Sequence, residues 1–285
     1  MAENIVEFLR KKDYNLLRYI GRGGTGVTVL LKDELIEKEF VCKKYLPIDG
    51  IDPQKYYNNF ISEVKILHEV SHLNIVRVYN YYLYPEKYTG YLLMEYIEGS
   101  DISDFVQRKP EAINSIFEQT ITGFKYLEEL NILHRDIRES NILITNDGVV
   151  KIIDFGFGKK IIFSDDLDKS VSLNWWCEIP NEFSEKKYGK ETEVYFVGKL
   201  FFNLLQQNNI EKFSYYSELK SMVELNPINR IKSFSSLETI IAEKNKLLDF
   251  FTQEEKDKYK QFANSLIKII SKIEDNTVYT KTDTI

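Results

Sequence analysis

Two short strings, separated by thirteen positions, constrain this chain more than any other feature of its sequence. The first runs from His134 to Asn141 and reads HRDIRESN; the second is Asp154-Phe155-Gly156, which follows a largely apolar run over residues 149–153. Asp136 carries an acceptor-only carboxylate, which can orient a hydroxyl group and take its proton. Asn141 and Asp154 offer oxygen ligands of the kind that Mg²⁺ takes beside phosphates and water. Either string could arise by chance, but both in this order rarely would.

A glycine-rich segment follows a strand-like run from Tyr14 to Ile20. Residues 21–26 read GRGGTG, a G-x-G-x-x-G pattern that, taken alone, also fits an ordinary hairpin turn. Glycines let backbone N–H groups approach phosphate oxygens without an intervening side chain. A dinucleotide-binding fold would need a helix after them, whereas residues 27–31 are β-branched and apolar and predict a strand. The segment is therefore predicted to be a turn between two strands; by itself it could be an ordinary hairpin or a loop that binds phosphate.

The next predicted strand, residues 39–45, carries a lysine that needs a partner. Period-two alternation puts Val41, Lys43 and Tyr45 on one face, with Phe40, Cys42 and Lys44 on the other. A buried ammonium group is costly unless it is paired. A helix is predicted over residues 57–67, because Phe60, Val64 and Leu67 are spaced for one buried face. This helix can supply the partner that Lys43 needs.

Together these features resemble the protein kinase family, whose catalytic signature is H-R-D-L-x-x-x-N followed by D-F-G. The likeness continues in SHLNIV at residues 71–76, in the hinge-like YLLMEYIEG at residues 91–99 and in Asn226-Pro227-x-x-Arg230. It spans about residues 14–241. The resemblance implies an α+β, two-lobed kinase-like fold with a small antiparallel-sheet N-lobe and helix C at residues 1–97. A larger, mainly helical C-lobe would occupy residues 98–245, a helical extension packed on it residues 246–275, and a flexible tail residues 276–285.

The same resemblance implies a role for each site residue. Asp136 would be the catalytic carboxylate, supported by Arg138; Lys43, paired with Glu63, would hold ATP phosphates; and Asn141 and Asp154 would bind Mg²⁺, or Mn²⁺ in its place. The loop glycines Gly21, Gly23, Gly24 and Gly26 would cover the phosphates. Contacts to the nucleoside are implied for Val41, the gatekeeper Met94, the backbone of Glu95 and Ile97, and Asp101 near the ribose. Thr28 replaces the family's valine, so Val27 or Val29 is expected to cover the adenine.

Departures from the family pattern leave some contacts open. Asn181 directly follows Pro180, so either Glu182, one position late, pairs with Arg230 or that ion pair is missing. Glu193 replaces the aspartate that in the family binds the backbone of the HRD turn. The short interval between Glu193 and Arg230 implies that the substrate-docking helix G is reduced to residues 210–223 or lost. Arg135 suggests an activation-segment phosphosite, for which Ser170 or Ser172 is preferred over Ser164.

Composition indicates which kinds of ligand and which cellular compartment suit this chain. A net charge of −6 argues against nucleic acid as the main ligand. No apolar stretch reaches membrane-spanning length, and the first residues do not read as a signal peptide. Cys42 and Cys177 suit a reducing cytoplasm better than a disulfide framework. A capping-box start at Thr252 opens a helix whose apolar side either packs on the C-lobe or contacts a partner, with a lysine-rich opposite side.

The sequence thus predicts a cytoplasmic, ATP- and magnesium-dependent protein kinase that modifies Ser or Thr of protein substrates and phosphorylates itself. Arg138 stands where Ser/Thr kinases usually have lysine, and some tyrosine kinases share it, so a tyrosine or dual-specificity enzyme is one alternative. A small-molecule kinase of the aminoglycoside or choline type is a second alternative. A third is a pseudokinase that binds ATP and acts only as a scaffold.

Overall fold

A computed structural model describes residues 13–23, 26–46, 52–154, 159–160, 176–182, 187–249 and 252–270. The chain divides into two compact units, Met1–Glu238 and Thr239–Ile285. Several predicted features lie outside the described residues: Gly24, the Phe155-Gly156 pair, the three candidate serines of the activation segment and the C-terminal tail.

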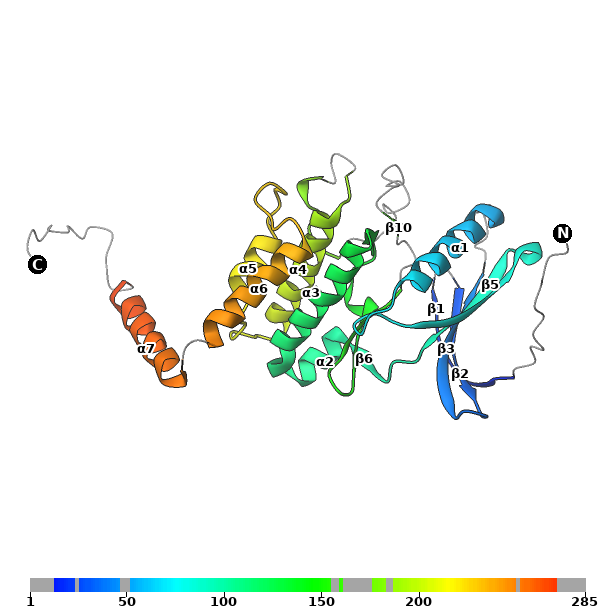
Figure 1. Cartoon of the computed structure of the whole chain (residues 1–285), viewed down its shortest axis with the longest axis horizontal. Helices are drawn as coiled ribbons and strands as arrows, with labels where there is room; N and C mark the ends of the chain where they lie inside the picture. Colours follow the sequence, from blue (N-terminus) through cyan, green and yellow to red (C-terminus); the bar gives the residue numbers. More distant parts are fainter. Residues whose placement is uncertain are drawn as a thin grey trace, which may run out of the picture. The chain divides into compact units, whose positions relative to one another are not determined.

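A five-stranded antiparallel sheet forms the N-terminal part of the first unit (Figure 1). Its strands are β1 (Asn15–Gly23), β2 (Gly26–Asp33), β3 (Lys38–Tyr45), β4 (Val78–Tyr84) and β5 (Thr89–Glu95), arranged in the order β1-β2-β3-β5-β4. The helix α1 (Pro53–Glu69) begins where the Asp52 side chain accepts the Gln54 N–H and Pro53 occupies the first turn. Tyr45 of β3 and Phe60 of α1 stack with ring centroids 4.6 Å apart, which fixes the helix against one face of the sheet.

The rest of the first unit is mainly helical. It contains α2 (Ile102–Arg108), α3 (Ile113–Glu129), α4 (Lys190–Gln207), α5 (Tyr216–Met222) and the start of α6 (Phe234–Asp249). Phe117 of α3 lies edge-on to Phe201 of α4, with centroids 4.9 Å apart and both rings fully buried. The two-lobed α+β fold predicted from the sequence is therefore confirmed. The segment predicted to hold a reduced helix G contains α5, which has only seven residues.

Short strands beside these helices carry the catalytic loop. A three-stranded sheet has the order β6-β8-β9, from β6 (Gly99–Asp101), β8 (Ile142–Thr145) and β9 (Val150–Ile152). The loop lies between β7 (Ile132–Leu133) and β8, and it includes the short 3₁₀ helix Glu139–Asn141. β7 pairs with β10 (Lys159–Lys160). Both ends of the loop are therefore anchored in buried backbone ladders.

The second unit contains the end of α6 and the helix α7 (Gln253–Ile270). Thr252 and Glu255 form the expected capping box: the Glu255 N–H donates to Thr252 Oγ1 at 3.3 Å, and the Thr252 N–H donates to Glu255 Oε2 at 2.8 Å. The packing of this segment on the C-lobe, and a partner contact through it, stay predictions. Across the described ranges, no helix combines the length and apolar character needed to span a membrane.

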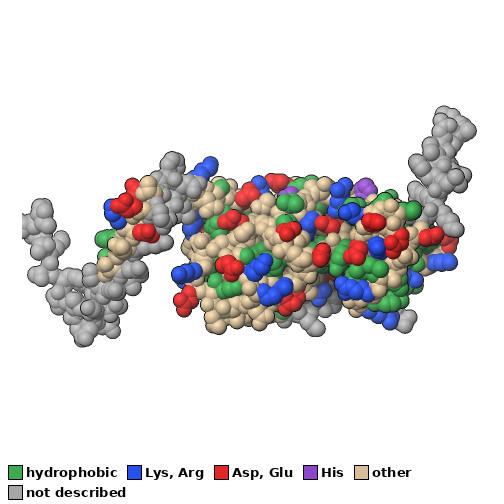
Figure 2. Space-filling view, turned by 90° about the horizontal axis from the view of Figure 1, so that it is seen from below, with side chains coloured by type: hydrophobic (Ala, Val, Ile, Leu, Met, Phe, Trp, Pro, Cys, Tyr) green, Lys and Arg blue, Asp and Glu red, His purple; other side chains and the backbone are tan. Residues whose placement is uncertain are grey.

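Surface charges of both signs are interspersed on the face of the molecule seen in Figure 2. Blue and red side chains alternate over it, and no broad field of a single sign stands out. Such a face does not form the continuous positive track that binding to a phosphate backbone requires.

Candidate active site

Lys43 lies at the centre of the candidate site, between α1 and the segment that follows β9. Its Nζ donates to Glu63 Oε1 at 3.2 Å and to Asp154 Oδ1 at 2.8 Å. Lys43 and Glu63 are both buried, whereas the Asp154 side chain is 36% exposed. The predicted alternation of β3 is confirmed, because Phe40 and Cys42 pack in a separate cluster with Leu93 on the other side of the strand. The structure thus joins three residues that are far apart in the sequence.

The ionisation of this trio follows from burial and charge. Burial opposes the charged form of Lys43, but the neighbouring carboxylates of Glu63 and Asp154 outweigh it and raise the lysine pKa. Burial also opposes ionisation of Asp154, yet the charge and hydrogen bond of Lys43 hold its pKa below the usual range. Burial raises the pKa of Glu63, because the loss of hydration of this fully enclosed carboxylate outweighs the stabilising charge of Lys43. Asp154 is therefore the carboxylate best prepared to carry a charge toward an incoming ligand.

The catalytic loop holds Asp136 in one orientation. Asn141 Nδ2 donates to the Asp136 backbone oxygen and to its Oδ2, both at 2.8 Å. Arg138 Nη2 lies 3.2 Å from the same Oδ2, although its side chain is half exposed. The Asp136 side chain is itself only 8% exposed. A carboxylate fixed in this way keeps one oxygen committed to the loop and leaves Oδ1 to meet an acceptor hydroxyl.

His134 links this loop to the strand that ends near Asp154. Its Nε2 lies 2.9 Å from the Ile153 carbonyl oxygen, and its Nδ1 accepts the Asp136 N–H at 3.3 Å. This pairing places the imidazole proton on Nε2. Burial lowers the pKa of His134 and favours the neutral ring that such a pattern requires. His134 therefore has a structural role: it connects the backbone of the catalytic loop to the backbone before Asp154.

Glu193 of α4 contacts the catalytic loop, although it replaces the aspartate that the family has at this position. Its Oε1 accepts the backbone N–H of Arg135 at 2.8 Å, so the longer side chain reaches the HRD turn as the shorter aspartate would. Arg135 has a positive φ of 63°, which a non-glycine residue adopts only under constraint. Trp176 adds a second support, because its Nε1 donates to the Ile137 carbonyl oxygen at 3.0 Å.

Glu182 and Arg230 do form the ion pair that the sequence left open. Arg230 Nη1 lies 2.6 Å from Glu182 Oε1, and Nη2 lies 3.2 Å from Oε2, so the contact is bidentate. Both residues are buried. The guanidinium also donates to three backbone oxygens, those of Glu224, Leu225 and Glu191.

The register of β2 and β3 contradicts one expectation from the sequence. β2 and β3 pair in regular register, with Thr28 opposite Lys43 and Val29 opposite Cys42. Since cross-strand neighbours share a face, Thr28 lies on the side of Lys43. Val29 packs against the Phe40, Cys42 and Leu93 cluster on the other side, and Val27 shares its face by alternation. The expectation that Val27 or Val29 covers the adenine is therefore wrong, because both lie on the face of the sheet opposite to Lys43, whereas Thr28 shares the face of Lys43.

Gly26 is required at this turn for steric reasons. A Cβ added to it would lie 2.0 Å from the Lys44 carbonyl oxygen, a contact that no rotamer can relieve. A Cβ on Gly21 would meet nothing within 4 Å. The two glycines of the pattern thus differ: a side chain at Gly26 would clash with the backbone of β3, whereas a Cβ at Gly21 would not.

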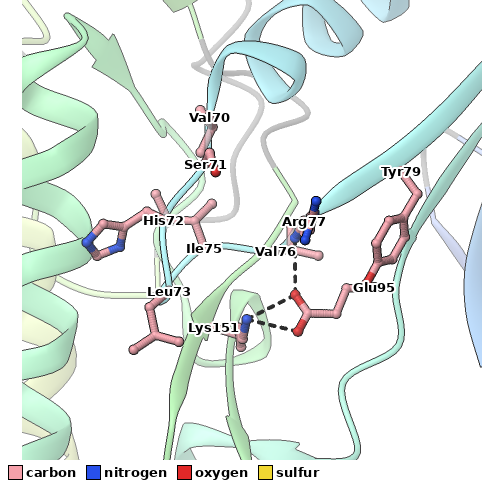
Figure 3. A pocket seen from close by; sticks show the side chains of 10 residues that line it. All are labelled: Val70, Ser71, His72, Leu73, Ile75, Val76, Arg77, Tyr79, Glu95 and Lys151. Atoms are coloured by element: carbon pink, nitrogen blue, oxygen red, sulfur yellow. Dashed lines mark hydrogen bonds and ion pairs between the residues drawn. The ribbon is translucent and has the colours of Figure 1, made fainter.

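The hinge-like segment carries an ion pair that sequence reasoning missed. Both carboxylate oxygens of Glu95, at the end of β5, contact Lys151 Nζ of β9, at 2.9 and 3.0 Å (Figure 3). Glu95 Oε2 also accepts the backbone N–H of Arg77 at 3.2 Å. Figure 3 shows this pair at one side of a cavity of about 330 Å³, lined mainly by residues 70–77. The Glu95 side chain therefore connects the hinge-like segment to β9, the strand before Asp154.

The other predicted nucleoside contacts have mixed surroundings. Ile97 is buried, and Val41 and Met94 are half-buried opposite one another on β3 and β5. The Asp101 side chain caps α2, where its Oδ1 accepts the Asp104 N–H at 2.9 Å. Asp101 thus has a structural task, and its contact with a ribose stays a prediction.

The residues present fit a divalent cation. Asn141 commits its Nδ2 to Asp136, which directs the amide oxygen Oδ1 away from that carboxylate. Asp154 commits Oδ1 to Lys43, and the Ile153 N–H beside it donates to the Asn141 carbonyl oxygen at 2.9 Å. These are hard oxygen ligands on adjacent backbone segments, and Mg²⁺ usually combines one or two such protein ligands with phosphate oxygens and water. Within the described residues no cluster of three or more His, Cys, Asp or Glu side chains could bind a metal alone. A cation held by Asn141 and Asp154 would complete its shell with phosphate oxygens or water.

The fold and this site define a class of proteins: two-lobed phosphotransferases with a lysine–glutamate pair, a carboxylate on a catalytic loop and a second carboxylate after a short strand. Residues 14–275 match the family model described as "Protein kinase domain". The chain belongs to the protein kinase family.

Individual relatives are distant. The chain is 27% identical over 197 residues to cyclin-dependent kinase-like 4 of Mus musculus, a match that covers 67% of this chain and 56% of that protein. It is 30% identical over 185 residues to the serine/threonine-protein kinase PAK mbt of Drosophila melanogaster, covering 63% and 28% respectively. It is 32% identical over 154 residues to the serine/threonine-protein kinases PknA of Corynebacterium glutamicum, covering 52% and 33%. The matches thus span from about a quarter to just over half of these relatives' lengths.

Sequence reasoning missed three contributors to the site: Lys151, Trp176 and Tyr188. Each acts through a partner that only folding supplies, namely Glu95, the Ile137 carbonyl oxygen and Glu193. Lys151 gave one usable signal, because a charged residue inside an otherwise apolar strand must find a partner when it is buried. The other two gave none.

Proposed function

We propose that this protein is an ATP- and Mg²⁺-dependent protein kinase that phosphorylates Ser or Thr residues of protein substrates, including its own. The observation that carries the proposal is the joint geometry of Lys43, Glu63, Asp154, Asp136 and Asn141. The Ser/Thr preference is supported by the Drosophila and Corynebacterium relatives, both of which are named as serine/threonine-protein kinases. Mn²⁺ is proposed as an alternative to Mg²⁺. The two free cysteines, Cys42 and Cys177, support a cytoplasmic location.

In the proposed reaction each residue has one task. Lys43, held by Glu63, binds phosphate oxygens of ATP; Asn141 and Asp154 hold the cation, which neutralises charge on the phosphates. The loop with Gly21, Gly23, Gly24 and Gly26 covers the phosphates, and Met94, Val41 and the backbone of Glu95 and Ile97 enclose the adenine. Asp136 accepts the proton of the acceptor hydroxyl, and the hydroxyl oxygen forms a bond to the γ-phosphorus of ATP. The bond from that phosphorus to the β–γ bridging oxygen breaks, and ADP leaves. Arg138 steadies Asp136 and the transferred group.

Asp136→Ala tests the proposal. The wild-type protein should transfer label from [γ-³²P]ATP to a generic protein acceptor in the presence of Mg²⁺. The rate of transfer by the variant should be about 10²- to 10⁴-fold lower, which is the range for loss of a positioned general base. The variant should still bind ATP, because the residues proposed to hold the phosphates and the metal are intact. Asp147→Ala, at an exposed aspartate in the turn after β8, is the matched control and should keep full activity. A wild-type protein that binds ATP and Mg²⁺ but transfers no phosphate would refute the enzyme and favour the scaffold.

Acid hydrolysis of the labelled product identifies the acceptor. Phosphoserine or phosphothreonine would support the proposal, whereas phosphotyrosine would assign the protein to the tyrosine or dual-specificity alternative that Arg138 raised. Transfer to small alcohols with none to proteins would assign it to the aminoglycoside or choline type. The scaffold alternative is disfavoured by geometry, because Lys43, Asp136 and Asp154 are all present and each is held by an ion pair.

A further inference from the structure

Tyr188 lies just before α4, close to Arg135 of the catalytic loop. Its hydroxyl donates to Glu193 Oε1 at 3.2 Å. The face of its ring lies 5.5 Å from the Arg135 guanidinium carbon, within the range of a cation–π contact. The ring also stacks against Phe196 of α4, with centroids 6.2 Å apart. One side chain therefore contacts two residues that set the conformation of the HRD turn.

Both contacts are made in a buried environment. Glu193 and Arg135 are 2% and 4% exposed, and Glu193 Oε1 is the atom that accepts the Arg135 backbone N–H. The guanidinium Nε of Arg135 is buried and has no hydrogen-bond partner among the described residues. A buried cation without a full set of partners depends on whatever electrostatic contact is available. Among the described residues, Arg135 has two such contacts, the ring of Tyr188 and the charge of Glu193. Its backbone is also held at a positive φ.

We infer that Tyr188 is a positioning residue for phosphoryl transfer: its hydroxyl fixes Glu193 under the HRD turn, and its ring holds the Arg135 side chain beside it. Asp136 follows Arg135 directly, so a turn that relaxes at Arg135 moves the carboxylate that must meet the acceptor hydroxyl. Displacements of this size reduce the rate of a positioned reaction without changing the reacting groups. The inference rests on the proposed kinase activity and adds to it a residue outside the family's signature strings.

The ionisation of Glu193 provides a readout specific to this role. Burial raises the pKa of Glu193 to about 7, while hydrogen bonds from the Arg135 N–H, the Tyr188 hydroxyl and the His134 backbone, together with the charge of Arg135, lower it. Asp136 is the other charged group near Tyr188. The hydroxyl stabilises the ionised carboxylate, so its removal raises the Glu193 pKa further. If the ionised form holds the turn, the acid limb of kcat moves to higher pH.

Tyr188→Phe is the decisive substitution, because it removes the hydroxyl and keeps the ring. We expect kcat to fall about tenfold with the KM for ATP changed less than about twofold, the pattern for an interaction made in the transition state. The acid limb of the kcat profile should move up by about half a pH unit or more. Amide exchange of the peptide that contains Arg135 should be faster in the variant. Tyr195→Phe is the matched control: this buried tyrosine of α4 donates to the Glu178 carbonyl oxygen and should leave the acid limb in place.

The outcomes separate this inference from the proposed function. A wild-type protein that transfers no phosphate refutes the kinase proposal itself. An active wild type with a Tyr188→Phe variant that has the same kcat, acid limb and exchange rate overturns the inference alone. Tyr188→Leu removes the ring as well and should lower kcat further; equal loss in the Phe and Leu variants overturns the part assigned to Arg135. Profiles recorded well below each variant's unfolding temperature keep any loss of stability out of the comparison.

Discussion

The buried pair of Glu182 and Arg230 gives the sharpest prediction for stability. In the Glu182→Gln variant, the Arg230 guanidinium would keep its carbonyl partners but lose its counter-charge in a site where its side chain is fully inaccessible. Removing one partner of a buried ion pair costs about 3 to 5 kcal/mol. For a domain of this size, 1 kcal/mol lowers the Tm by about 2 to 4 °C, so the variant should unfold about 6 to 20 °C below wild type.

Urea unfolding followed by tryptophan fluorescence measures this loss, since Trp176 lies a few positions before Glu182 in the sequence. Glu178→Gln is the matched control: Glu178 is 60% exposed and lies 3.7 Å from Lys199, so its loss should cost less than about 1 kcal/mol. A Glu182→Gln variant whose free energy of unfolding stays within about 1 kcal/mol of wild type would refute the reasoning. It would mean that the three backbone oxygens around Arg230 stabilise the cation without a carboxylate.

Three further predictions concern single sites. Gly26→Ala should lower the Tm by several degrees, because its Cβ would clash with the Lys44 carbonyl oxygen, whereas Gly21→Ala should leave the Tm unchanged in a thermal scan without nucleotide; equal effects would contradict the steric argument. Burial raises the pKa of Cys42 and of Cys177 to about 11, so neither thiol should react with Ellman's reagent at pH 8 within minutes unless the protein is unfolded; rapid reaction of either would show that it is not enclosed. The pKa of Glu193, raised by burial to about 7, means that the folded protein binds a proton that the unfolded chain releases near pH 4.5. Its contribution to stability is therefore complete below that pH and is lost as pH rises toward 7, with a slope of at most about 1.4 kcal/mol per pH unit. Glu193→Gln should remove this slope in urea titrations, and an unchanged slope would assign it to other groups.

Much of this protein was determined by the sequence itself. The strings around Asp136 and Asp154 were enough to indicate the family, because the chemistry of phosphoryl transfer restricts which residue types can stand there. Alternation along β3 distinguished Lys43 from Lys44, since a strand directs neighbouring side chains to opposite faces. Glu63 was identified by its match to the helix C glutamate of the family, in a helix whose apolar spacing predicted one buried face. Of these residues, only Lys43 was assigned from a local periodicity that sets the direction of its side chain.

Tertiary structure alone decided the contacts that span the chain. Whether Glu182 reached Arg230 depended on the path of the backbone between them, and no local pattern records that path. Strand register, not proximity to the glycine loop, placed Thr28 instead of Val27 or Val29 on the side of Lys43. The Glu95–Lys151 pair and the contacts of Tyr188 likewise join residues whose separation in sequence says nothing of their distance in space. Such contacts form only when folding brings polar groups from distant segments together in a place shielded from water.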